Sequence, residues 1–224
     1  METVKINENG VDIFVTEAEN YIQINDLIEK QAESTWEYLL ANYPSFDLFF
    51  SFNSERMKRS EAIPTQFLAE INAELVDDTL NFTLKAEDLN DKNSNNLETT
   101  RLTEAEFDTF AKFHDAKNPN IYWTSKRIKA RFDLWQIQIS KKGNQINGYS
   151  MLMITEKIAE IFTIYAENEL IFEALLQESC KNAFAESSPE ILYLIDRVEI
   201  KQQQCARKLG FKETGFYRGY QVKL

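Results

Sequence analysis

The histidine and the cysteines of this chain limit the reactive-group chemistry that it can carry. His114 is the only histidine, which excludes a His-rich metal site and disfavours a Ser-His-Asp triad. We interpret it as a polar residue at the C-terminus of a predicted helix. Cys180 and Cys205 lack zinc-type spacing, and both fall on apolar faces of predicted helices, which favours inert core cysteines over a reactive thiol. Two cysteines also suit a reducing compartment better than a disulfide framework, so we expect a cytoplasmic protein without a bound metal.

Carboxylates are abundant and unevenly distributed. Residues 1–90 contain 18 Asp and Glu against 6 Lys and Arg, a balance of −12 in a chain whose net charge is −11. This excess would repel phosphates, so we expect no nucleic-acid partner. It could attract a cationic partner or a small amine substrate, although a solvated, solubilising surface explains it equally simply and is the reading we favour. No apolar run approaches 18 residues, so no membrane span is expected.

Part of the sequence occurs twice. Residues 12–20 read DIFVTEAEN and residues 160–168 read EIFTIYAEN, with five of nine positions identical. In both copies the predicted order continues with an amphipathic helix, a short apolar strand, a second helix and closing strands. So long a separation does not suit a solenoid repeat. We interpret the pattern as two copies of one α/β unit.

The elements that would carry the first copy follow from its hydrophobic periodicity. Their predicted order is a strand at 11–16, a helix at 18–42, a strand at 47–52, a helix from Asn53 or Ser54 to about 72, and a strand at 75–84. A polar Asn- and Asp-rich stretch follows at 85–98 and predicts a boundary. We therefore expect domains at 1–90 and 97–224.

The second copy is longer, because further elements precede its repeated part. The predicted elements are strands at 99–102, 134–140, 147–154, 159–165 and 190–196, helices at 103–115, 125–132, 168–185 and 198–209, and a terminal hairpin at 211–224. Thr103 and Glu106 form a capping box. Gly210 is placed to end the last helix.

Three short motifs point to a family. Residues 208–217 read KLGFKETGFY, residues 146–149 read INGY and residues 159–162 read AEIF. In this order and spacing they resemble the C-terminal, third-strand and fourth-strand motifs of the GNAT superfamily of N-acetyltransferases. The resemblance covers about residues 99–224, and the first copy matches only the back half of the same unit.

The resemblance implies an α/β (α+β) fold, a mixed twisted sheet with flanking helices in which the back half of the unit is duplicated. Only ten residues precede Val11, too few for the front strands and helices of a complete first unit. A half-unit leaves an exposed sheet edge. The second unit could cover that edge, or a neighbouring chain could, which makes a homodimer one alternative.

The resemblance also implies a site. Acetyl-CoA would lie between splayed fourth and fifth strands, at 159–165 and 190–196. The backbone near Ile164, Tyr165 and Ala166 would meet the pantetheine arm, and Asn168 would bind the cofactor at the start of the next helix. Glu160 would act as general base toward an amine, with a solvent-facing strand carboxylate as the alternative. Tyr165 would be the acid, with a packing role as its alternative, and Tyr193 is a second such candidate.

Two departures from the family pattern support a different reading. The glycine-rich loop that presents backbone N–H groups to a pyrophosphate is absent, and Glu167, Glu169 and Glu173 stand in its place. Ala206 occupies the position of the usual Tyr acid and cannot donate a proton. We therefore expect weak acetyl-CoA binding or none. The alternative function is a non-catalytic GNAT-derived module for binding or assembly.

Overall fold

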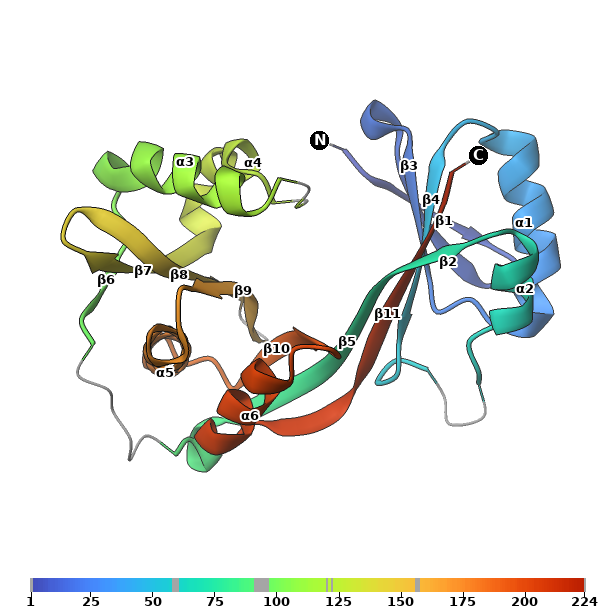
Figure 1. The fold of residues 1–224 in the computed structure, drawn as a ribbon. Helices are drawn as coiled ribbons and strands as arrows, with labels where there is room; N and C mark the ends of the chain where they lie inside the picture. The colour runs from blue at the N-terminus through green and yellow to red at the C-terminus, as the bar shows by residue number, and fades with distance from the viewer. Residues whose placement is uncertain are drawn as a thin grey trace. The chain divides into compact units, whose positions relative to one another are not determined.

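A computed structural model describes residues 2–57, 61–90, 97–119, 121, 123–155 and 158–223. The chain divides into two compact units (Figure 1): residues up to 81 with 195–198 and 214–224, and residues 82–194 with 199–213. Consequently β5 (Glu74–Lys85), β10 (Glu190–Asp196) and β11 (Lys212–Lys223) contribute residues to both units. Residues 91–96 lie outside the described part, and the division into 1–90 and 97–224 stays a prediction.

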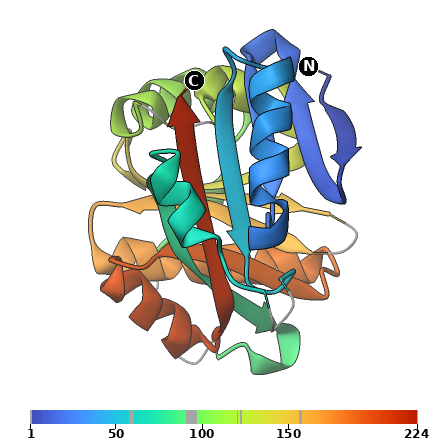
Figure 2. The ribbon, with the colours of Figure 1, turned by 90° about the vertical axis from the view of Figure 1, so that its right-hand side faces the viewer.

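The first unit is a mixed sheet with both of its helices on one face (Figure 2). Its strands follow the order β1-β2-β3-β4-β11-β5. The β3/β4 pair is parallel, whereas β1/β2, β2/β3 and β4/β11 are antiparallel. The remaining elements are β1 (Val4–Glu8), β2 (Val11–Thr16), β3 (Tyr21–Asn25), α1 (Glu29–Asn42), β4 (Asp47–Asn53) and α2 (Thr65–Glu70).

Alternating apolar residues of these strands build the core of the first unit, because successive strand side chains point to opposite faces. The fully buried members include Ile13, Ile22, Ile24, Leu48, Phe50 and Phe52. From α1, Leu39 is buried and Trp36 is packed against the same cluster. Leu40, which we expected to be buried, is 42% exposed, because it lies one residue beyond the helix stripe that faces the sheet.

The helix predicted at 18–42 is wrong over residues 18–28. A 3-10 turn at Glu17–Glu19 is followed by β3, and α1 begins only at Glu29. Ile22 and Ile24 alternate with polar residues and are fully buried, so a strand satisfies them better than a helix. The helix predicted at 53–72 is reduced to α2, which begins after Pro64; residues 58–60 lie outside the described part.

The second unit has the strand order β5-β10-β9-β8-β7-β6. Helices α3 and α4 lie on one face of its sheet and α5 lies on the other (Figure 1), where it contacts β7, β8 and β9. The elements are β6 (Thr99–Arg101), α3 (Phe107–Lys117), α4 (Ser125–Ala130), β7 (Trp135–Lys142), β8 (Gln145–Ile154), β9 (Ala159–Ala166), α5 (Glu169–Ala185) and α6 (Ile200–Leu209).

Most of the local signals of the second unit are confirmed. The capping box of Thr103 and Glu106 is present, and Gly210 ends α6 in the left-handed conformation with φ 105°. Gly148 gives α5 room to approach β8, because a Cβ there would lie 3.0 Å from Leu175 Cδ1. Among the described residues, no helix is long and apolar enough to cross a membrane.

The predicted C-terminal hairpin is wrong, because β11 is one continuous strand. Gly215 and Gly219 are not turn residues, and neither has a positive φ. They permit close approach instead: a Cβ at Gly215 would overlap Ser54 Oγ, and one at Gly219 would overlap the Phe49 ring. Packing space, not backbone conformation, explains both glycines.

The two copies of the repeat occupy strands with different surroundings. In the first copy, β2 is antiparallel to both of its neighbours, β1 and β3. In the second copy, β9 is antiparallel to β8 and parallel to β10. The strand with the surroundings of β9 is β3, which is antiparallel to β2 and parallel to β4. The order β2-β3-α1-β4-α2 therefore matches β8-β9-α5-β10-α6. The sequence repeat aligns β2 with β9, whereas the strand pairing aligns β3 with β9.

Candidate functional site

Strands β9 and β10 separate part-way along their length, as the sequence predicted. Their parallel pairing covers only Ile191/Ala159, Leu192/Glu160 and Tyr193/Ile161. Beyond Ile161, β9 continues to Ala166 and remains paired with β8. The edge of β9 that faces away from β8 therefore carries backbone N–H and C=O groups without a strand partner in β10. Such an edge can bind an extended chain through main-chain hydrogen bonds.

An irregularity in β9 lies next to this separation. The register with β8 shifts between Leu152/Ile161 and Met151/Thr163, which leaves Phe162 without an opposite residue. A bulge of this kind bends a strand and changes the direction of its side chains, and bulges are common next to active sites. The ring of Phe162 packs against Trp135 at 5.0 Å and Trp123 at 6.2 Å, on the face covered by α3 and α4.

Glu160 precedes the point of separation by one residue. It lies opposite Met153 of β8, which in turn lies opposite Trp135 of β7, so the three side chains share a face of the sheet. Glu160 is half-buried, and burial raises the pKa of its carboxyl above the usual value. A raised pKa brings a carboxylate closer to the range in which it serves as a general base at neutral pH.

The structure places the other predicted site residues along the free part of β9. Ile164 is buried, whereas Tyr165 and Ala166 are half-buried. The ring of Tyr165 stacks on Tyr149 at 6.1 Å and meets Phe113 edge-on at 5.4 Å, an arrangement that serves packing. Its role as acid stays a prediction. Tyr193 is 2% exposed and donates its hydroxyl to Gln202 at 2.9 Å, so it is poorly placed to protonate a substrate.

The N-terminus of α5 is capped by a side chain of its own chain. Asn168 is the N-cap, and its Oδ1 accepts a hydrogen bond from the Ile171 N–H at 3.1 Å. The N–H of Glu167 donates to the carbonyl of Asn147 at 3.0 Å. One of the donors that the start of α5 offers to an anion, the Ile171 N–H, is therefore already used, and the Glu167 bond continues the pairing of β8 with β9. The capping role explains Asn168 without a cofactor.

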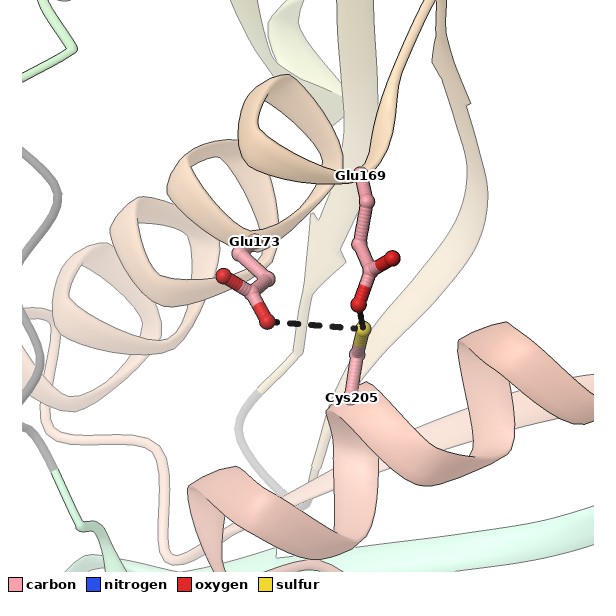
Figure 3. Close-up of side chains that lie close together, drawn as sticks. All are labelled: Glu169, Glu173 and Cys205. Carbon is pink, nitrogen blue, oxygen red and sulfur yellow. Dashed lines mark hydrogen bonds between the residues drawn. The ribbon is translucent and has the colours of Figure 1, made fainter.

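Acidic side chains surround the same helix start (Figure 3). Glu169 and Glu173 of α5 point toward Cys205 of α6, whose Sγ lies 4.0 Å and 3.8 Å from their Oε1 atoms. Lys208 Nζ lies 3.7 Å from Glu169 and 3.4 Å from Glu173. Burial, followed by the two carboxylates, raises the pKa of the Cys205 thiol to about 11. A metal would need this thiol deprotonated and would compete with Lys208 for the carboxylates, so the cluster suits a structural role.

No proton donor stands at the position expected for the acid. Ala206 is fully buried in α6, and its methyl group offers no exchangeable proton. The neighbouring Cys205 is occupied with the two carboxylates. The donor that the family usually places here is therefore missing, while the strand edge and Glu160 are present.

A buried network centred on His114 was missed by the sequence reasoning, which placed this residue at an open helix end. His114 is fully buried. Its Nε2 lies 2.8 Å from the carbonyl of Trp123, which can only accept, so Nε2 carries the proton. Tyr149 then donates to Nδ1 at 2.7 Å, and Asn118 donates to the Tyr149 hydroxyl at 2.8 Å. The spacing of His114 and Asn118, one helical turn apart, was the available signal. The network fixes Trp123 near Phe162.

Solved structures share this architecture. A functionally unknown conserved protein from Staphylococcus epidermidis matches 99% of this chain and 94% of its own, with TM-score 0.70 and 12% identity. A GCN5-related N-acetyltransferase from Kribbella flavida matches 98% and 89%, with TM-score 0.69 and 11% identity. A tandem GNAT protein from the clavulanic acid biosynthesis pathway matches 95% and 78%, with TM-score 0.59 and 10% identity. The chain has the fold of the GNAT superfamily.

No protein-family model matches the sequence, and no curated protein matches it either. The GNAT fold therefore rests on the structure and on the three motifs. In the second unit, β9 and β10 are the strands that the resemblance identified as the fourth and fifth of the GNAT unit, and they separate as it implied.

The first unit has the same strand pattern but no separation. The β3/β4 register is continuous over five pairs, from Tyr21/Asp47 to Asn25/Ser51. Asp26 then continues the link, because its N–H donates to the Ser51 carbonyl at 2.7 Å and its Oδ1 accepts from the Asn53 N–H at 2.8 Å. Between these two strands the first unit leaves no edge free for an acyl donor.

Proposed function

We propose that the second unit is a GNAT-type N-acyltransferase that moves an acetyl group from acetyl-CoA to an amine. The observation that carries this proposal is the separation of β9 from β10 beyond Ile161 and Tyr193, next to a half-buried carboxylate at Glu160. The free backbone of β9 near Ile164, Tyr165 and Ala166 would hold the pantetheine arm as an added strand. This part of the site fits the donor.

The residues at the pyrophosphate end do not fit. Asn168 already occupies the Ile171 N–H there, and Glu167, Glu169 and Glu173 add negative charge. We therefore propose that the donor is held mainly by its pantetheine arm and that the nucleotide contributes little to affinity. The free energy lost would be large, because both hydrogen bonds and charge complementarity are missing.

Glu160 would take the proton that the amine loses as its nitrogen bonds to the thioester carbon. The carbon–sulfur bond breaks in the same reaction, and the thiolate takes its proton from the Tyr165 hydroxyl, which solvent then reprotonates, because Ala206 supplies none. The half-buried aromatic side chains of Trp123 and Phe162 on the same face, which pack on the buried Trp135, would contact an apolar part of the acceptor.

Calorimetry tests the donor site. We expect acetyl-CoA and S-acetylpantetheine to bind with similar, weak affinity, within about tenfold of each other. Much tighter binding of acetyl-CoA would contradict the missing pyrophosphate site. If neither compound binds, the acyltransferase proposal fails.

A substitution tests the base. Glu160→Gln should leave S-acetylpantetheine binding intact and lower the turnover of a small amine by about 10²–10⁴-fold, the usual contribution of a general base. Glu178→Gln, a half-buried glutamate on α5, is the matched control and should retain activity. Equal turnover of the two variants would remove Glu160 from the reaction.

A second function is favoured by the N-terminus of α5, which carries the Asn168 cap and acidic side chains. If Asn168 and the Glu169–Glu173–Lys208 cluster have replaced donor binding, the chain is a non-catalytic GNAT-derived module for ligand binding or assembly. A thermal-shift titration separates the two functions, since acetyl-CoA raises the melting temperature only if it binds the native state. A flat titration up to millimolar concentration supports the second function.

A further inference from the structure

Helix α3 places two side chains against the ring of Tyr165, the residue that the proposed reaction uses as its acid. Phe113 meets this ring edge-on at 5.4 Å. Lys117 lies one helical turn further along α3, and its ammonium lies over both rings, 5.2 Å from the centroid of Tyr165 and 5.8 Å from that of Phe113. An ammonium within about 6 Å of an aromatic centroid is attracted by the ring electrons. Lys117 therefore places a positive charge beside the proposed acid.

The ring of Tyr165 is also fixed by a neighbour in the sheet. Tyr149 lies opposite Tyr165 in the β8/β9 pairing, and the two rings stack at 6.1 Å with 19° between their planes. The Tyr149 hydroxyl is in turn held by His114 at 2.7 Å and by Asn118 at 2.8 Å. A buried network in which each polar group has a partner is rigid. Tyr165 therefore has a defined ring position, over which the ammonium of Lys117 is placed.

The reaction assigned to Tyr165 needs such a charge. A tyrosine phenol ordinarily loses its proton at about pH 10 and a cysteine-type thiol at about pH 8.5. Proton transfer from a phenol to a thiolate is therefore uphill unless the phenolate that results is stabilised. The negative charge of a phenolate is delocalised into the ring, so an ammonium over the ring attracts it more strongly than it attracts the neutral phenol. An interaction that strengthens toward the transition state in this way raises the rate.

We propose that Lys117 is a positioning residue for acyl transfer in the second unit: its ammonium orients the Tyr165 ring and stabilises the phenolate. This inference rests on the proposed function. When the carbon–sulfur bond breaks, its electron pair stays on sulfur. The O–H bond of Tyr165 then breaks and an S–H bond forms, while Lys117 keeps its three protons. Solvent returns a proton to Tyr165, and Glu160 gives the proton of the amine to solvent.

Three variants separate the charge of Lys117 from its packing. A lysine that only covers apolar surface acts through its methylene stem. Lys117→Met keeps most of that stem and removes the charge, whereas Lys117→Arg keeps a positive charge. Lys112→Met, at an exposed position on the same helix, is the matched control.

Turnover is measured with S-acetylpantetheine as donor and with n-butylamine and 2-phenylethylamine as acceptors. We expect Lys117→Met to lower turnover by about fivefold to tenfold, a small part of the 10²–10⁴-fold that acid–base catalysis contributes. Lys117→Arg and Lys112→Met should stay within about twofold of the unchanged protein. A loss in Lys117→Arg as large as that in Lys117→Met would contradict a role for the charge.

The leaving group shows whether the loss acts through the acid. The thiolate released from S-acetyl-4-nitrothiophenol is a weak base and leaves without taking a proton. We expect Lys117→Met to lower turnover of this donor by less than about twofold, after the uncatalysed aminolysis is subtracted. An equal loss with both donors would mean that Lys117 only supports the structure, and the proposal would be wrong.

A double-variant cycle connects Lys117 to Tyr165. Tyr165→Phe keeps the ring and removes the proton, so Lys117→Met should cause no further loss of turnover in that background. Losses that simply multiply in the double variant would show that the two residues act independently, against the assignment.

Two further readouts need no turnover. Calorimetry should give the same S-acetylpantetheine affinity for Lys117→Met and for the unchanged protein, because Lys117 acts after the donor has bound. In NMR spectra, ring currents should shift the ε-methylene signal of Lys117 upfield, and Tyr165→Leu should reduce that shift. Weaker donor binding by Lys117→Met, or an unshifted ε-methylene signal in the unchanged protein, would overturn the proposal.

Failure of the proposed function gives a different result. If the unchanged protein transfers the acetyl group from neither donor to either amine, the proposed function fails and this inference fails with it. If the unchanged protein is active and Lys117→Met is equally active, only the inference fails.

Discussion

Nζ of Lys208 lies 3.4 Å from Oε1 of Glu173, so an ion pair joins α6 to the second turn of α5. The same ammonium lies 3.7 Å from Glu169. These contacts fill the helix start at which a GNAT-type site would need positive potential and free N–H groups. At the N-terminus of α5, these side chains join α5 to α6 instead.

Removing the two carboxylates should improve donor binding. We expect the Glu169→Gln/Glu173→Gln double variant to bind acetyl-CoA about tenfold or more tightly than the unchanged protein, because repulsion of roughly 1 kcal/mol per close charge pair is relieved. Calorimetry at low salt would measure the difference, and added salt should reduce it. Unchanged affinity, with Glu178→Gln as the control, would mean that the charge is not what weakens binding.

The Cys205 thiol should be unreactive in the native protein. It is 2% exposed, and its pKa of about 11 keeps it protonated at neutral pH. Iodoacetamide should therefore label neither Cys205 nor the buried Cys180 until the protein is unfolded in urea. Rapid native labelling of Cys205, identified by peptide mass mapping, would contradict the structure.

Packing on the sheet side of α5 can be tested with two leucines of the same helix. Leu175 is fully buried and Leu170 is 58% exposed. Leu175→Ala should lower the free energy of unfolding by about 2–5 kcal/mol through the lost burial and the cavity. Leu170→Ala should change it by less than about 0.5 kcal/mol. Urea denaturation would measure both, and similar values would mean that the wrong face of α5 has been assigned to the core.

The His114 network should be important for stability. In His114→Ala, the Tyr149 hydroxyl loses the acceptor of its proton and keeps only its bond from Asn118, and the Trp123 carbonyl loses the Nε2 donor; each buried hydrogen bond lost in this way costs about 1–3 kcal/mol. We expect a loss of about 2–5 kcal/mol in unfolding free energy and a changed environment for Trp123, visible as a shift in tryptophan fluorescence. A loss below about 1 kcal/mol would show that water replaces the ring readily.

The capping box at the start of α3 should contribute to acid sensitivity. Hydrogen bonding from Lys141, then from Thr103, lowers the pKa of Glu106 to about 2. Because the folded-state pKa lies below the unfolded value, its stabilisation is complete above about pH 4.3 and is lost as the pH falls toward 2. Partial exposure of both partners reduces the size of the effect. Glu106→Gln should flatten the stability profile between about pH 4.3 and 2, and an unchanged profile would count against the pair.

Local patterns were sufficient for most of the second unit. The strand at Glu190–Asp196 and the stop at Gly210 follow from apolar runs and one glycine, because these features depend on neighbours in sequence. The separation of β9 and β10 was reached through the family motifs. Prediction failed where distant contacts decide the outcome. Ile22 and Ile24 are buried by sheet neighbours, and Gly219 is required by the nearby ring of Phe49.

The repeat of residues 12–20 at 160–168 indicated the wrong pair of corresponding strands for a related reason. Ile13 and Ile161 are both buried strand residues, so the same residue type suits both positions. Strand direction and neighbour identity, which distinguish β2 from β9, leave little trace in a nine-residue segment. The site was reached only in part, because the His114 network joins α3 to β8 and to the Trp123 segment, which lie far apart in the sequence.

The position of β11 in the chain has a consequence for biosynthesis. β4 pairs with Tyr217–Lys223 of β11, which the ribosome makes after β4, α2 and β5 and after the described helices and strands of the second unit. Until then one edge of β4, with Phe50 and Phe52 along it, has no partner from β11. A nascent chain stalled before β11 would therefore expose the unpaired backbone N–H and C=O groups along this edge of β4. We infer that chaperone contact or aggregation would concentrate there.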